Sequence, residues 1–127
     1  LKDWHGPAEG ECPAAYVIMV QDKPDKAFSR WGLVDLGIAA QNLVLAAADI
    51  GIASCMIGSF NQDKVAELIQ LPEELEIGLI IALGKPGEKV IIEPLAPGKD
   101  VKYWRDQEDA HHVPKRGLEE VVIKKFL

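Results

Sequence analysis

The adjacent cations Lys115 and Arg116 stand near the end of an acidic chain, in the stretch "AHHVPKRGLEE" at residues 110–120. Two long cations that follow a rigid proline can meet one phosphate, because arginine offers a fork of donors and lysine a point charge. The same pair can equally be a solvated surface charge beside Glu119 or Glu120, which would contribute little to stability. The spacing alone leaves both interpretations open.

A glycine within "MIGSF", residues 56–60, is the second candidate for chemistry. Gly58, with Met56 and Ile57 before it and Ser59 after it, can simply permit the chain to turn between two elements. A residue without a side chain also allows backbone N–H and C=O groups to lie close against a flat ligand. Taken alone, the motif favours neither interpretation.

The histidines and cysteines do not have the spacing of a metal site. His111 and His112 are neighbours, so in a strand they point to opposite faces and cannot chelate one ion together. His5 is isolated, and we expect the other two histidines to lie on the surface or pack in a hairpin. Cys12 and Cys55 show no Cys-x-x-Cys pattern, so we expect small, buried or half-buried thiols and neither zinc nor a disulfide.

Motifs for other catalytic chemistries are also missing from the sequence. No serine is framed as Gly-x-Ser-x-Gly, and no phosphate-binding Gly-x-x-x-x-Gly-Lys-Ser/Thr or dinucleotide-binding Gly-x-Gly-x-x-Gly occurs. We therefore assign no catalytic side chain and no metal ligand, and hydrolase and triphosphatase functions have no support.

Composition indicates one soluble domain. A chain of 127 residues with 48% hydrophobic content is long enough for one core and too short for two. The net charge of −6 argues against binding to nucleic acid or an anionic membrane. Because we find neither a leader sequence nor an uninterrupted apolar run of roughly 18 residues, we expect a cytoplasmic protein.

The hydrophobic pattern predicts alternating strands and helices in the first part of the chain. The run Ala14–Asp22 is rich in Val, Ile and Tyr and predicts a buried strand. A helix is expected over Ser29–Asp49, ended by Gly51. The following "ASCMIGSFN" is expected to be a loop, with Asn61 as the N-cap of a second, amphipathic helix.

The long helix shows an apolar stripe with steps of three and four residues. We expect this helix to be buried most of the way round, in a core or an interface, because the residues between are also apolar or small. The stripe consists of Leu33, Leu36, Ala40, Leu43, Ala47 and Ile50.

The second half predicts one buried strand and a less regular end. The apolar run within Leu75–Glu88 is bounded by Gly-Lys-Pro-Gly, as expected for a strand covered on both faces. Residues 101–113 predict a hairpin or surface excursion around "DQED". Beyond Pro114 the chain can be a strand or a short helix. The order of elements indicates an α/β or α+β fold.

Taken together, three segments resemble the FMN-dependent nitroreductase family. They are "DLGIAAQNLVLAAADIGIASCMIGSF", "LPEELEIGLIIALGKPGE" and "VPKRGLEE". The resemblance runs from about Cys12 to Val122 and covers what corresponds to the carboxy-terminal two-thirds of such a protein. It implies an α+β fold with a central sheet flanked by helices.

The resemblance also implies a function and a site. It implies an NAD(P)H oxidoreductase that passes electrons by a ping-pong cycle to a nitroaromatic, quinone or similar small-molecule acceptor. Residues matching Met56, Ile57, Gly58 and Ser59 lie beside the flavin ring in such proteins, and those matching Lys115 and Arg116 reach the FMN phosphate. A homodimer with FMN at the subunit interface is implied as well.

The sequence departs from the family pattern at its beginning. Members start with a helical region that carries an Arg-x-Ser-x-Arg-like motif, and no such region precedes these residues. We therefore expect residues 1–127 to be a single nitroreductase-like domain, incomplete at its amino terminus, which alone binds FMN weakly or not at all. The alternative is a non-catalytic flavin-binding or dimerisation domain of the same fold.

Overall fold

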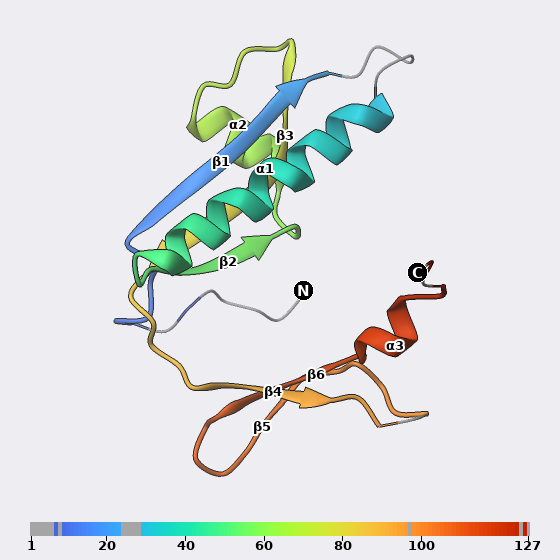
Figure 1. The fold of residues 1–127 in the computed structure, drawn as a ribbon. Helices are drawn as coiled ribbons and strands as arrows, with labels where there is room; N and C mark the ends of the chain where they lie inside the picture. The colour runs from blue at the N-terminus through green and yellow to red at the C-terminus, as the bar shows by residue number, and fades with distance from the viewer. Residues whose placement is uncertain (1–6, 8, 24–28, 97, 125, 127) are drawn as a thin grey trace. The chain divides into compact units, whose positions relative to one another are not determined.

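The computed structural model describes residues 7, 9–23, 29–96, 98–124 and 126. The chain separates into two compact units, residues 1–86 and residues 87–127, which we call unit 1 and unit 2 (Figure 1). Each unit contains its own three-stranded sheet. That the two units form one domain stays a prediction.

Unit 1 is built on an antiparallel sheet with the order β1-β3-β2. The strands are β1 at Ala15–Asp22, β2 at Ala53–Ile57 and β3 at Leu75–Gly84. The central strand β3 supplies most of the core, because its partners cover both of its edges and helices cover its faces. Its buried side chains are Ile77, Ile80, Ile81 and Ala82.

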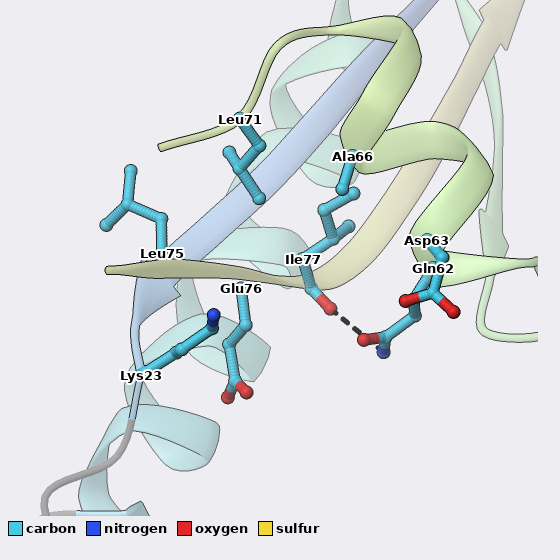
Figure 2. Close-up of a pocket in the computed structure, with 8 residues that line it drawn as sticks. All are labelled: Lys23, Gln62, Asp63, Ala66, Leu71, Leu75, Glu76 and Ile77. Carbon is cyan, nitrogen blue, oxygen red and sulfur yellow. Dashed lines mark hydrogen bonds between the residues drawn. The ribbon is translucent and has the colours of Figure 1, made fainter. Parts of the chain in front are cut away.

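Two helices flank this sheet, α1 at Ser29–Asp49 and α2 at Gln62–Leu68. They lie on opposite faces of the strands, as Figures 1 and 2 show. Asn61 is the N-cap of α2, since its Oδ1 accepts a hydrogen bond from the backbone N–H of Lys64 at 2.9 Å. The predicted cap and the predicted α+β arrangement, a central sheet flanked by helices, are both confirmed.

A glycine on β3 brings α1 close to the sheet. The pairing of β1 with β3 shifts between Met19 and Val20, so that Gly78 is left without a partner residue, as in a β-bulge. A side chain at Gly78 would collide with Leu36 of α1. The missing Cβ therefore makes room for the helix.

The predicted stripe on α1 is correct in its middle and wrong at its ends. Ala40 and Ala47 are buried, and Leu36 and Leu43 are half-buried. Leu33, near the start of α1, is exposed, and so is Ile50, which lies in the turn just after the helix ends.

The expectation that α1 is buried most of the way round is wrong for this chain. Trp31, Val34, Ile38 and Leu45 are all exposed, Ile38 by 56% and Leu45 by 59%. A three-stranded sheet covers one face of the helix, and no other described element of unit 1 packs on the opposite face. Unit 1 therefore leaves many of the apolar side chains of α1 exposed.

The prediction of a loop directly after α1 is also wrong, because Ala53–Ile57 forms the edge strand β2. Ala, Ser and Cys at its start give little local strand signal. The strand arises from pairing with β3, for example Met56 opposite Ile81. Such pairing between distant residues is not visible in the local pattern.

Unit 2 has a small mixed sheet with the order β4-β6-β5 (Figure 1). Strand β4 at Val90–Pro94 runs parallel to β6 at His111–Lys115, and β5 at Trp104–Arg105 runs antiparallel to β6. The predicted hairpin is therefore confirmed as β5–β6. Strand β4 was not predicted, and the segment after Pro114 forms the short helix α3 at Leu118–Val121.

One helix among the described residues passes the length and composition test for a membrane span. Residues Trp31–Asp49 of α1 reach a mean hydropathy of 1.4, although Asp35, Gln41 and Asn42 interrupt the apolar run. A helix that packs in the interior of a soluble protein passes the same test, and a single such helix is weak evidence for a membrane.

Candidate cofactor-binding site

The candidate ring-contacting residues lie where β2 leaves the sheet. Met56 and Ile57 are the last two residues of β2, and Gly58 and Ser59 follow before the cap of α2. Met56 is 42% exposed, and both Gly58 and Ser59 are exposed. The four residues thus form a surface segment anchored on the central strand.

This segment has the backbone properties that a planar ligand needs. Because β2 is an edge strand, one row of its N–H and C=O groups points away from β3 and is not used by the sheet. A Cβ placed on Gly58 would meet nothing within 4 Å, and the backbone of Gly58 is outside the left-handed region. Neither packing among the described residues nor backbone strain therefore requires a glycine here.

The candidate phosphate-binding pair lies at the end of the unit 2 sheet. Lys115 is the last residue of β6, and Arg116 follows it directly; both are exposed. The carbonyl oxygen of Lys115 accepts a hydrogen bond from the backbone N–H of Leu95 at 2.8 Å, which anchors the backbone of this pair to the end of β4. Among the residues that the structure describes, neither cationic side chain has an ion-pair partner.

The two glutamates that the surface-charge interpretation expects beside Lys115 and Arg116 form no ion pair with them in the described part of the chain. These glutamates, Glu119 and Glu120, lie in the first turn of α3. The cations are available for an anion from outside. The two groups of site residues, 56–59 and 115–116, belong to different units, and each is established only within its own unit.

A small hollow on unit 1 is separate from these residues. It lies between α2 and β3, has a volume of about 120 Å³, and combines apolar side chains with Lys23, Asp63 and Glu76 (Figure 2). Pockets for cofactor-sized ligands usually measure about 300 to 1,000 Å³. The hollow is too small for a flavin, and no residue of 56–59 lines it.

The predicted packing of the two histidines in a hairpin is confirmed, and it brings together a cluster that the sequence did not reveal. His112 is buried, stacks on Trp104 with ring centroids 4.0 Å apart, and has a carboxylate at each ring nitrogen. Its Nδ1 lies 2.6 Å from Oε1 of Glu93, and its Nε2 lies 3.2 Å from Oδ2 of Asp106. These partners come from β4 and from the turn after β5.

Hydrogen bonds within this cluster shift two ionisation equilibria. The hydrogen bonds to Glu93 and then to Asp106 raise the pKa of His112 above its ordinary value, against the opposing effect of desolvation. The hydrogen bond from His112 is the largest cause that lowers the pKa of Asp106. The sequence gave no signal for this cluster, because Glu93 lies 19 residues before His112 and on another strand, and the approach of Asp106, six residues before His112, depends on how the hairpin folds.

His111 points to the other face, as expected for neighbours in a strand. Its ring meets Tyr103 edge to face with centroids 4.9 Å apart, and its Nδ1 lies 3.3 Å from Oε2 of Glu88. That carboxylate also pairs with Arg105 at 2.6 Å. Within the described residues, no group of three His, Cys, Asp or Glu side chains has the arrangement of a metal site.

The predicted burial of the cysteines is wrong. Cys12 precedes β1 and Cys55 lies on the edge strand β2, and both are exposed free thiols in this chain. Side chains on an edge strand are more accessible to solvent than those on a central strand, which has neighbours on both sides. His5 lies outside the described residues.

The chain is similar in sequence and fold to flavin oxidoreductases. The family model described as the nitroreductase family matches residues 2–85, which is more than half of the chain and includes the segment 56–59. The α+β fold and this match together define the class of the protein: the chain belongs to the nitroreductase family. The basic pair at 115–116 lies beyond the matched residues.

Individual relatives agree with this assignment. DrgA of Synechocystis sp. is 45% identical over 64 residues, which are 50% of this chain and 28% of that protein. The FMN reductase (NADPH) of Bacillus subtilis is 34% identical over 71 residues, 54% of this chain and 28% of that protein. The chain thus spans less than a third of the length of these relatives.

A solved structure supports the fold. The crystal structure of nitroreductase A from Vibrio parahaemolyticus superimposes with a TM-score of 0.58 at 25% identity, over 76% of this chain and 49% of that one. The central sheet with flanking helices is therefore the nitroreductase arrangement, present here over part of the length of that protein.

Proposed function

We propose that this chain supplies part of the flavin site of a soluble, cytoplasmic, FMN-dependent NAD(P)H oxidoreductase. The observation that carries the proposal is the segment 56–59: an edge strand is followed directly by a glycine with open space around it, in a chain of the nitroreductase family. The names of two relatives, FMN reductase (NADPH) and NADPH-flavin oxidoreductase of Vibrio harveyi, support both the cofactor and the electron donor.

The residues present fit two parts of FMN. Backbone groups of Met56, Ile57 and Gly58, with Ser59, would face the ring, since a flat ligand can approach a strand edge where no side chain intervenes. Lys115 and Arg116 would hold the phosphate through charge-assisted hydrogen bonds. A bound FMN would supply the redox chemistry, taking a hydride from NAD(P)H and reducing a nitroaromatic, quinone or similar acceptor in a second half-reaction.

In this proposal the protein contributes binding and orientation and needs no acid–base side chain. Main-chain donors on β2 would tune the ring electronically, and an open face would admit first the nicotinamide and then the acceptor. This division of labour agrees with the lack of an acid–base triad motif in the sequence.

We further propose a homodimer with the flavin at the subunit interface. The support is the exposed apolar face of α1, which includes Ile38 and Leu45 and which the sheet of the same chain does not cover. Exposed apolar patches on a soluble domain favour contact with a partner. A second copy would bury this face and complete each flavin site.

Steady-state kinetics distinguish the enzyme from the non-catalytic alternative. A polypeptide that contains these residues and retains FMN should oxidise NADPH with a quinone or nitroaromatic acceptor. Varying both substrates should give parallel double-reciprocal lines, the pattern of a ping-pong cycle. Flavin binding without NADPH or NADH oxidation by any of these acceptors would instead establish a storage or dimerisation domain.

A further inference from the structure

The buried histidine of unit 2 has a hydrogen-bonding environment that only one of its protonation states satisfies. An ionised carboxylate can only accept hydrogen bonds, whereas a neutral imidazole has one donor nitrogen and one acceptor nitrogen. Each ring nitrogen of His112 faces one carboxylate: Nδ1 lies 2.6 Å from Glu93 and Nε2 lies 3.2 Å from Asp106. With both carboxylates ionised, both ring nitrogens must carry a proton.

The two carboxylates are held in place from independent sides. Oδ1 of Asp106 accepts the backbone N–H groups of Glu108 and Ala110, both at 2.9 Å, so the turn itself orients the carboxylate whose Oδ2 meets His112. Glu93 lies on β4, opposite Pro114 of β6. His112 therefore joins a strand to a turn that share no other described side-chain bond.

This connection matters because the sheet around it is small. Strand β5 has two residues, and β4 and β6 have five each. So few strand pairs are marginally stable without further support. Trp104 stacks on the histidine at an interplanar angle of 13° and excludes water from one face of the ring.

We propose that His112 is a doubly protonated clasp, formed with Glu93 and Asp106, that holds β4 to the β5–β6 hairpin and opens when the ring loses a proton as the pH rises. The charged groups in contact with His112 are Glu93 from β4 and Asp106 from the turn. The nearby cation Arg105 engages Glu88 and Asp109 instead.

The direction of the pH dependence follows from the two shifts. The pKa of His112 is raised in the folded state, so its stabilising contribution is complete below the ordinary histidine value and is lost as the pH rises through the folded value. The pKa of Asp106 is lowered, so its contribution is lost only as the pH falls through that depressed value. The clasp is closed between these limits.

The clasp has a consequence that rests on the proposed function. Lys115 lies three residues after His112 on β6, and its carbonyl oxygen is bound by Leu95 directly after β4. Opening the β4–β6 pair would release the backbone that carries the proposed phosphate-binding cations. The clasp itself can be tested without flavin.

The test is an NMR titration of the 127-residue chain with ¹⁵N-labelled histidine, in which His112→Gln and His111→Gln assign the signals. We expect both ring nitrogens of His112 to remain protonated where a free histidine would titrate, and the midpoint to lie above that ordinary value of about 6.5. Amide exchange, corrected for its intrinsic base catalysis, should accelerate in β4 and β6 through that titration and leave β3 unchanged.

Two variants separate the clasp from general charge effects. Glu93→Gln should shift the His112 titration downward. Glu108→Gln removes an equal charge from an exposed position in the turn that carries Asp106 and should leave the titration in place. A His112 that titrates at or below the ordinary histidine value would overturn the proposal. A titration of wild-type His112 that leaves amide exchange in β4 and β6 unchanged would also overturn the proposal. This wild-type measurement is decisive even if a variant does not fold.

Discussion

At the scale of single residues, the basic pair offers a direct test of phosphate binding. Replacing Lys115 and Arg116 together by Ala should weaken FMN affinity by roughly tenfold for each cation removed, since hydrogen bonds to charged groups contribute about 1.5 to 3 kcal/mol each. The fold should persist, because both side chains are exposed. Affinity would be measured by flavin fluorescence quenching in a polypeptide that contains these residues and retains FMN.

A matched control for this double variant exists in the same unit. Lys99 and Lys102 are exposed, and replacing both by Ala removes the same charge. Equal loss of affinity in the two double variants would assign the effect to net charge and return Lys115 and Arg116 to the solvated-surface interpretation.

Gly58 gives a second test at this scale. Gly58→Ala should leave stability nearly unchanged, because the added Cβ meets nothing within 4 Å in this chain. It should lower FMN affinity by about tenfold or more if the ring lies against this backbone, since a methyl group in a tight contact is costly. Gly87→Ala is the control, as Gly87 has equally open surroundings; unaltered FMN affinity in Gly58→Ala would remove this segment from the site.

At the scale of elements, the capping of α2 is open to measurement. Asn61→Ala removes the acceptor for the N–H of Lys64 and should lower the free energy of unfolding by about 1 kcal/mol. Urea denaturation of the 127-residue chain would measure the change. Asn61→Asp retains an acceptor and should stay near wild type; an equal loss in both variants would show that the cap does not stabilise α2.

Local signals explain which elements the sequence revealed. The N-cap Asn61 and the apolar stripe from Leu36 to Ala47 on α1 are local signals, because each depends on residues only a few positions apart. Both were predicted correctly. Strands β2 and β4 were not predicted, because each depends on a partner far along the chain: Met56 opposite Ile81, and Ile91 opposite His112. Edge strands and parallel pairs carry weak local patterns.

The same reasoning holds for the candidate site. Motifs and the family resemblance were enough to single out Gly58, which follows β2, and Lys115, which ends β6. The clasp around His112 could not, because Glu93 and Asp106 reach it only through the three-dimensional pairing of β4, β5 and β6. Burial of α1 was overestimated, because the sheet of unit 1 covers only one face of this helix.

At the scale of the whole molecule, the proposed homodimer predicts a response to charge on α1. Ile38→Lys places a cation on an apolar surface that is 56% exposed in one chain, so it should be tolerated by a monomer and raise the dissociation constant of a dimer by about tenfold or more. Light scattering at micromolar concentration would measure the mass. Glu73→Lys, at an exposed loop position, is the control; identical masses for wild type and both variants would place the interface elsewhere.

The visible absorption spectrum shows whether these residues belong to the flavin site of an NAD(P)H oxidoreductase. The spectrum would be recorded with added FMN after removal of free flavin, before and after anaerobic NADPH, on the 127-residue chain and on a longer polypeptide that contains it. We expect the longer polypeptide to retain a flavin spectrum that NADPH bleaches, and the shorter chain to retain little or no flavin. A longer polypeptide that stays colourless after FMN addition would contradict this assignment.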